Sequence, residues 1–261
     1  MSEKKKRNKG KRWLSNIVLL CCVAVFVFST WKLTGYLTEY KEGEQVYEEI
    51  AQYVTVPEPD KKVPEKEYPP KVQWEKLYDI NSDLVAWIHI EDTMIQYPVV
   101  QCEDNEYYLN NTFDGSDNNC GCIFMDAGNE PDFTSDNTIL HGHNMKTGAM
   151  FGTLQYYNDE EYWEEHPYIW IITKDRAMKY EIFATYRTGV TDPVYTLEFG
   201  SEENFETYIE ECKKNGLYDT GVEVTAKDRL LTLSTCTSDT EEGRRVVQAK
   251  LVYDEEIKDE S

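Results

Sequence analysis

An uncharged segment near the amino terminus divides this chain into parts that must occupy different environments. Residues 1–12 hold seven Lys and Arg against one Glu, and no charged side chain occurs from Trp13 to Trp31. Within this segment, Ile17–Phe28 is apolar throughout. About 20 residues of helix cross a bilayer core, Trp favours the membrane interface, and basic residues stay on the cytoplasmic side. We therefore expect a cytoplasmic tail, a single transmembrane signal anchor at 13–31, and the rest of the chain outside the cell.

A cleaved signal peptide is the alternative for this segment. Its 12-residue apolar run also suits the hydrophobic region of a signal peptide. No A-x-A-like pattern of small residues follows this run, and Phe28-Ser29-Thr30-Trp31 is a poor cleavage site for a signal peptidase. The sequence thus favours an uncleaved anchor.

The charge and the cysteines of the remaining chain exclude several classes of protein. Beyond residue 12 there are 20 basic and 48 acidic side chains, which would repel a phosphate backbone, so no nucleic-acid partner is expected. The seven cysteines lack the spacing of a disulfide framework or of a paired zinc site. We expect no metal and no cofactor.

The outer part of the chain changes composition twice. Residues 32–71 contain helical spacing of apolar residues at 39–53, followed by five prolines among charges at 56–70, which predicts a helix and an extended stalk. A domain with regular β patterning follows at 72–253. The acidic residues 254–261 are expected to form a frayed tail.

Short β-rich runs separated by turn signals dominate the domain. A helix is predicted at 72–81, and a second at 201–216, where Ser201 can cap the start and Gly216 can end it. The predicted strands are 84–90, 94–100, 122–126, 137–143, 168–173, 179–188, 229–236 and 244–253. This pattern predicts a mainly β barrel or sandwich with one helix inserted between two late strands.

Three segments carry residues suited to acyl transfer: ILHGHNM (139–145), LTLSTC (231–236) and RRVVQAKLV (244–252). A thiol attacks as the thiolate, so a nearby imidazole must take its proton and can later protonate a leaving amine. A guanidinium can stabilise negative charge on the attacked carbonyl oxygen or orient the peptide. By spacing alone this signal is weak, because a distant Cys and His often occur together by chance.

The same segments resemble those of the sortase family, the Gram-positive surface transpeptidases. The matching motifs are TILHGHNMKTGAMFGTL (138–154), TLSTC (232–236) and RRVVQAKL (244–251). The helix before the Cys strand, the amino-terminal helices and GCIFMD (121–126) are similar to class B in particular, and the resemblance covers about residues 40–253. It implies an eight-stranded β-barrel with amino-terminal helices and one inserted helix before the Cys strand.

The resemblance also implies roles for individual residues. His143 is the expected general acid and base, Cys236 the nucleophile, and Arg244, five residues before Ala249, the expected oxyanion or substrate stabiliser. At the position of His141 the family commonly has an aromatic residue. Further candidates for substrate contact or for support of the site are Ser234, Thr235, His141, Asn144 and Arg245.

The implied activity is that of a membrane-anchored cysteine transpeptidase of the thiol hydrolase class. The thiol would cleave a carboxy-terminal sorting signal of the NPxTx or xPxTG kind after Thr, forming a thioester. An amine from a peptidoglycan precursor or a pilin would then accept the acyl group. The expected partners are thus surface proteins with a sorting motif, an amine acceptor, and the membrane.

Several alternatives stay open on the sequence. His141 and His143 lie two apart, which would place them on one face of a strand and could seed a zinc site, although no third ligand is evident. Neighbouring strand residues face opposite ways, so only one of Arg244 and Arg245 can meet Cys236, and the spacing favours Arg244. A plain extracellular cysteine peptidase or a non-catalytic adhesin or sensor ectodomain are the other functional hypotheses.

Overall fold

The structure is a computed structural model that describes residues 3–57, 69–237 and 242–257. The chain divides into two compact units, residues 1–42 and 43–261. Most of the predicted stalk, at 58–68, and the end of the predicted tail, at 258–261, lie outside the described residues.

Helix α1 (Glu3–Ala51) contains both the predicted anchor and the predicted helix at 39–53 as one continuous helix. From Trp13 to Leu37 its side chains are exposed, although this stretch contains the longest apolar run of the sequence. Among the described residues, α1 is the one helix that is long and apolar enough to cross a membrane by length and composition.

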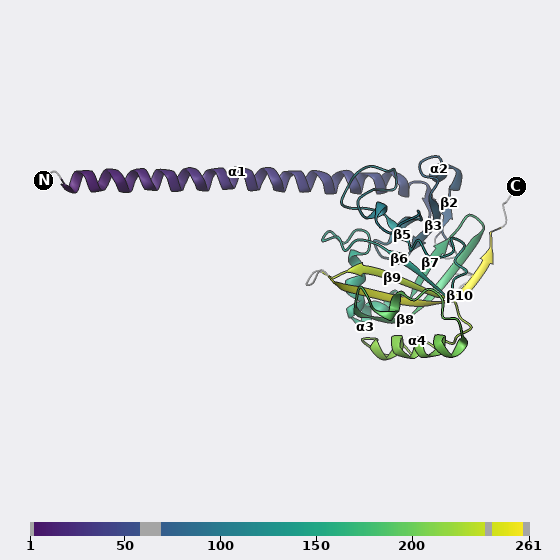
Figure 1. Cartoon of the computed structure of the whole chain (residues 1–261). Coiled ribbons are helices and arrows are strands. Elements are labelled where there is room, and N and C mark those ends of the chain that lie inside the picture. Colours follow the sequence, from purple (N-terminus) through teal and green to yellow (C-terminus); the bar gives the residue numbers. More distant parts are fainter. Residues whose placement is uncertain (1–2, 58–68, 238–241, 258–261) are drawn as a thin grey trace. The chain divides into compact units, whose positions relative to one another are not determined.

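Eight strands close into a barrel, which confirms the predicted architecture (Figure 1). The bounds differ from the predicted ones by a few residues at most sites. The strands are β3 (Leu84–His89), β4 (Gln96–Val100), β5 (Ile123–Met125), β6 (Asn137–His141), β7 (Tyr168–Ile172), β8 (Arg176–Gly189), β9 (Leu230–Cys236) and β10 (Gly243–Glu256).

The order of the strands brings distant segments together. Around the barrel it runs β10-β8-β7-β3-β4-β5-β6-β9, and β9 pairs with β10 to close it. The β4–β5 and β6–β9 pairs are parallel, and the other pairs are antiparallel. Because β6 and β9 are parallel and β10 is antiparallel to β9, the ends of β6 and β9 and the start of β10 meet at one end of the barrel.

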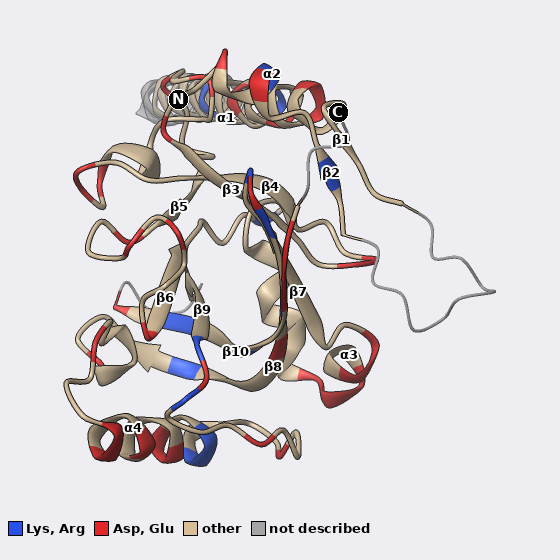
Figure 2. Ribbon diagram, turned by 90° about the vertical axis from the view of Figure 1, so that its right-hand side faces the viewer, with Lys and Arg blue, Asp and Glu red and all other residues tan. Residues whose placement is uncertain are grey.

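The predicted inserted helix is confirmed as α4 (Glu202–Asn215), between β8 and β9. Ser201 caps it, accepting a hydrogen bond from the Asn204 amide, and four apolar residues form its buried stripe. This stripe packs on β8 and β10, where it contacts Tyr186 and Val246. Figures 1 and 2 show α4 alongside these strands. The stripe consists of Phe205, Tyr208, Ile209 and Cys212.

Smaller helices and a two-stranded sheet connect the strands, and several of them were not predicted from the sequence. A two-stranded sheet, β1 (Val54–Thr55) with β2 (Lys71–Val72), takes the first residues of the predicted 72–81 helix, so α2 is only Trp74–Tyr78. Asp159 caps a short helix within an acidic run, accepting a hydrogen bond from the Glu161 amide. The remaining elements are η1 (Tyr107–Leu109), η2 (Gly152–Asn158), α3 (Glu160–Glu165) and η3 (Pro193–Tyr195).

The acidic tail begins later than predicted. Residues 254–256 continue β10, pairing with the start of β8. Asp254, expected to be in the frayed tail, forms ion pairs with Arg176 and Arg229. These two cations neutralise the acidic end of the strand and allow it to extend.

Candidate active site

The segment that carries His143 continues beyond the end of β6 and runs beside the end of β9, which carries Cys236. The Gly142 amide donates to the Ser234 carbonyl at 3.1 Å, continuing the parallel β6–β9 pairing past the end of β6. Asn144 Nδ2 then donates to the Cys236 carbonyl at 2.9 Å. Asn144 thus ties the histidine loop to the end of the Cys strand, which gives this predicted support residue a physical role.

Cys236 is the last residue of β9 and is exposed, whereas Ser234 and Thr235 just before it are buried. Its thiol is therefore accessible to a peptide. The residue borders a cleft of about 210 Å³ at the end of the barrel. The cleft is lined by Asn144, Gln155, Asn158, Arg187, Thr235, Cys236, Thr237 and Arg245.

The other cysteines of the barrel unit are less accessible, and none of them forms a disulfide bond within the described residues. Cys120, Cys122 and Cys212 are buried, and Cys102 is half-buried. Burial raises the pKa of Cys122 to about 12 and also raises the pKa of Cys212. Thiols in such surroundings stay protonated and are poor nucleophiles.

His143 is held by the backbone of a different loop. Its Nε2 lies 2.6 Å from the carbonyl oxygen of Leu109, and its own carbonyl accepts from the Phe151 amide at 3.0 Å. A carbonyl oxygen only accepts, so Nε2 carries a proton in this contact. In the neutral ring the lone pair then lies on Nδ1, which is the atom left to exchange a proton.

The two candidate arginines occupy opposite faces of β10. Arg244 lies directly opposite Cys236 in the antiparallel β9–β10 pair, and directly opposite residues project to the same face of a sheet. Its Nη1 donates to the Gly243 carbonyl at 2.9 Å. Arg245 lies opposite Thr235 on one side and Arg187 on the other, is 5% exposed, and lines the cleft at the barrel end.

Tyr195, at the end of η3, belongs to this site although sequence reasoning missed it. Its hydroxyl lies 2.9 Å from Ser234 Oγ. Burial raises the pKa of Tyr195, with hydrogen bonding to Ser234 and the charge of Arg244 acting in the opposite direction. The barrel topology brings η3 to the outer face of β9, and no local motif marks this tyrosine. The weak signal was the Asp192-Pro193 cap of η3.

His141 and His143 point to different partners. Strand β6 ends at His141, so the alternation that would place both rings on one face does not continue to His143. His141 Nε2 lies 3.1 Å from Asp126 Oδ2, and the ring stacks with Tyr195 at 6.2 Å between centroids. Among the described residues, no group of three or more His, Cys, Asp or Glu side chains is arranged to hold a metal ion.

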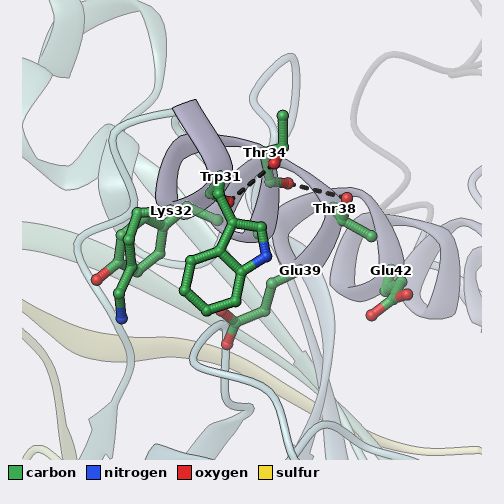
Figure 3. Close-up of a pocket in the computed structure, with 8 residues that line it drawn as sticks. Trp31, Lys32, Thr34, Thr38, Glu39 and Glu42 are labelled. Atoms are coloured by element: carbon green, nitrogen blue, oxygen red, sulfur yellow. Dashed lines mark hydrogen bonds between the residues drawn. The ribbon is translucent and has the colours of Figure 1, made fainter. Parts of the chain in front are cut away.

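A larger hollow, of about 510 Å³, runs along α1 between Trp31 and Glu42. Figure 3 shows Thr34 and Thr38 bonded back to the helix backbone, with the indole of Trp31 lying beside them. All of its lining residues come from α1, and they include no thiol and no imidazole. This hollow therefore contains neither the thiol nucleophile nor the imidazole base expected for acyl transfer.

Comparison with known proteins decides the family. The sortase domain family matches residues 88–252, a range that contains His143, Cys236 and both arginines. This chain belongs to the sortase family. Sortase B of Listeria monocytogenes is 36% identical over 246 residues, which cover 94% of this chain and 99% of the relative.

Solved sortases B support the same class and the same fold. A substrate complex of Staphylococcus aureus sortase B superposes with a TM-score of 0.72 at 32% identity, covering 82% of this chain and 98% of that one. Sortase B of Bacillus anthracis in complex with AAEK1 gives 0.70 at 36% identity, covering 83% and 99%. The chain is thus a class B sortase, and its enzyme class is cysteine transpeptidase.

Proposed function

We propose that this sortase cleaves a sorting signal after Thr through Cys236 and transfers the acyl group to an amine at the cell envelope. The observation that carries the proposal is the placement of an exposed thiol at the end of β9, opposite Arg244 and alongside the His143 loop. The signal is of the NPxTx or xPxTG kind. The acceptor is an amine of a peptidoglycan precursor or of a pilin.

In the first half-reaction, the sulfur of Cys236 attacks the backbone carbonyl carbon of the Thr of the sorting signal. The thiol proton passes to Nδ1 of His143, while Nε2 stays bonded to the Leu109 carbonyl. Collapse of the tetrahedral intermediate breaks the peptide C–N bond, and the imidazolium returns its proton to the departing amine. The products are a thioester and the free distal peptide.

In the second half-reaction, the acceptor amine attacks the thioester carbonyl. His143 takes a proton from the amine, the C–S bond breaks, and the proton returns to the sulfur of Cys236. A new amide forms and the thiol is regenerated, so the bonds formed and broken balance without a metal or a cofactor.

Arg244 is proposed to act on the oxygen of the attacked carbonyl. It shares a face of the sheet with Cys236, and a guanidinium presents several N–H donors in a fixed plane. Negative charge builds on that oxygen in both half-reactions, so the same residue would stabilise both transition states. Ser234 and Tyr195 are hydrogen-bonded to each other next to this face. We propose that they contact the sorting signal near its Thr.

The membrane is the proposed location of the enzyme, with the amino terminus in the cytoplasm and the barrel outside the cell. The support is the basic run at 1–12 before the apolar segment, together with the length of α1. A tether at the membrane would place the barrel where exported proteins emerge.

The deciding experiment incubates the full chain in nanodiscs with LPxTG, NPxTN and SPxTG peptides, with and without triglycine. A transpeptidase gives a triglycine adduct of the amino-terminal fragment, and its yield rises with the amine concentration. A plain cysteine peptidase gives the same acid product at every triglycine concentration, and an adhesin cleaves nothing. Cys236→Ala and His143→Ala are the inactive controls.

A further inference from the structure

We propose that Tyr47, on the last turns of α1, is a positioning residue for His143. The inference rests on the acid and base role proposed for His143. It assigns to the carboxy-terminal turns of α1 a part in fixing the orientation of the catalytic ring, through Gly121. Tyr47 and His143 both belong to the unit formed by residues 43–261.

The first link is a buried hydrogen bond. The Tyr47 hydroxyl donates to the Gly121 carbonyl at 2.5 Å, across 74 residues of sequence, and the side chain is 7% exposed. Burial raises the pKa of Tyr47 well above its ordinary value, with the nearby thiols of Cys122 and Cys120 acting in the same direction. The hydroxyl therefore stays protonated and remains a donor over the physiological pH range.

The second link is the contact between Gly121 and the histidine. Gly121 has a φ of +61°, and a Cβ added there would lie 2.9 Å from the Leu109 carbonyl oxygen and 3.0 Å from Cδ2 of His143. Gly121 thus leaves no room for a side chain between itself and both the imidazole ring and the carbonyl that binds its Nε2. A shift of Gly121 would displace the ring, its acceptor, or both.

Helix α1 contacts the same loop at a second point, one turn earlier. A Cβ at Gly43 would lie 3.0 Å from Asn118 Oδ1 and 3.0 Å from Cys120 Cβ. Residues four apart share one face of a helix, so Gly43 and Tyr47 present a single surface to this loop. The absence of a side chain at Gly43 lets the helix approach closely enough for the Tyr47 hydrogen bond.

The ring of Tyr47 supports the histidine by a separate route. It packs edge-on against Tyr97, with centroids 5.4 Å apart. The Tyr97 hydroxyl accepts from the Met150 amide at 3.1 Å, and the Phe151 amide donates to the His143 carbonyl at 3.0 Å. Tyr47 is therefore connected to the His143 ring through Gly121, and to the His143 backbone through Tyr97 and residues 150–151.

Tyr47→Phe separates positioning from packing, because it keeps the ring and removes only the hydroxyl. Tyr157→Phe is the matched control, since the Tyr157 hydroxyl also donates to a backbone carbonyl, that of His166, at 2.8 Å, and Tyr157 is also buried. Both variants are made in the full chain in nanodiscs. Each loses a neutral hydrogen bond from a buried hydroxyl to a backbone carbonyl, so both stabilities should fall.

Two readouts test the proposal. Steady-state transpeptidation gives kcat and KM, and long-range 15N NMR of labelled histidine gives the tautomer of His143, identified among the four histidines by its loss in His143→Ala. We expect wild type to show the Nε2–H tautomer. In Tyr47→Phe, we expect kcat to fall about tenfold, KM to stay within twofold, and the Nδ1–H tautomer of His143 to appear. These changes are expected when the imidazole is less firmly held in its catalytic orientation.

Either of two results overturns the proposal. One is a folded Tyr47→Phe enzyme with the wild-type tautomer and a kcat equal to that of Tyr157→Phe. The other is an NMR spectrum of the wild-type enzyme in which neutral His143 carries its proton on Nδ1. Failure of the proposed function is distinct: wild type then gives no triglycine adduct with any of the peptides, while the tautomer measurement still decides the role of Tyr47.

Discussion

Arg244 and Cys236 are directly opposed residues of the antiparallel β9–β10 pair, so their side chains leave the sheet on the same face. Arg245, one residue later, is opposed to Thr235 and is buried at the end of the barrel. The two arginines are adjacent in sequence but meet different surroundings. Substitutions at these two positions should therefore have different effects.

Arg244→Ala should lower kcat/KM by about a hundredfold or more while leaving the melting temperature nearly unchanged, because it removes donors aimed at a developing charge. Arg245→Ala should lower the melting temperature by several degrees, since it empties a buried position, and should change the kcat/KM of the folded enzyme only mildly. Peptide cleavage kinetics together with thermal unfolding measure both. A larger kinetic loss in Arg245→Ala would mean that the proposed roles of the arginines are reversed.

Alkylation should single out Cys236. At pH 7.5, iodoacetamide is expected to modify it at least about tenfold faster than Cys212 or Cys122, because Cys236 is exposed while burial keeps the other two thiols protonated. Peptide mass mapping after short exposure gives the individual rates. Equal rates at Cys236 and Cys212 would argue against every cysteine-enzyme hypothesis for this chain.

The elements that local pattern determines were predictable from the sequence. All eight barrel strands and α4 follow from β-rich runs, turn signals and a capped apolar stripe, and the sortase motifs lie on segments that the topology brings to one end of the barrel. The ends of the strands were less predictable, because the partners of Asp254, Arg176 and Arg229, lie far from it in the sequence. Pattern alone could not place Tyr195 or Tyr47 near the site, since their contacts depend on loops closing over the barrel.

Asp126 should make the stability depend on pH in the acidic range. Burial acts to raise the pKa of Asp126, but hydrogen bonds from His141, Gly128 and Asn105 outweigh it, and the pKa lies below its ordinary value of 3.8. A carboxylate whose pKa is depressed on folding stabilises the fold above its ordinary pKa, and this contribution is lost as the pH falls through the folded value.

Comparison with Asp126→Asn isolates that contribution. The variant should be about 1 kcal/mol less stable than wild type near pH 6, and the difference should shrink as the pH falls below about 4. Urea unfolding at a series of pH values measures it. A constant difference across this range would show that the ionised form of Asp126 contributes nothing to the stability.

The orientation in the membrane predicts which thiols are reachable from outside. If the proposed orientation holds, a membrane-impermeant maleimide applied to intact cells labels Cys236 on the outer barrel and leaves Cys21 and Cys22 unlabelled within the proposed anchor. Detergent lysis before labelling provides the comparison. Labelling of Cys236 only after lysis would place the barrel in the cytoplasm.

The thioester at Cys236 is the central claim, and trapping it is the most direct test. The full chain is mixed with its preferred sorting peptide in the absence of an amine, quenched in acid, and analysed by intact and peptide mass spectrometry. We predict an adduct equal in mass to the peptide fragment ending at Thr, located on Cys236 and released by hydroxylamine. Peptide turnover without such an adduct, or with the adduct on another residue, would contradict the mechanism.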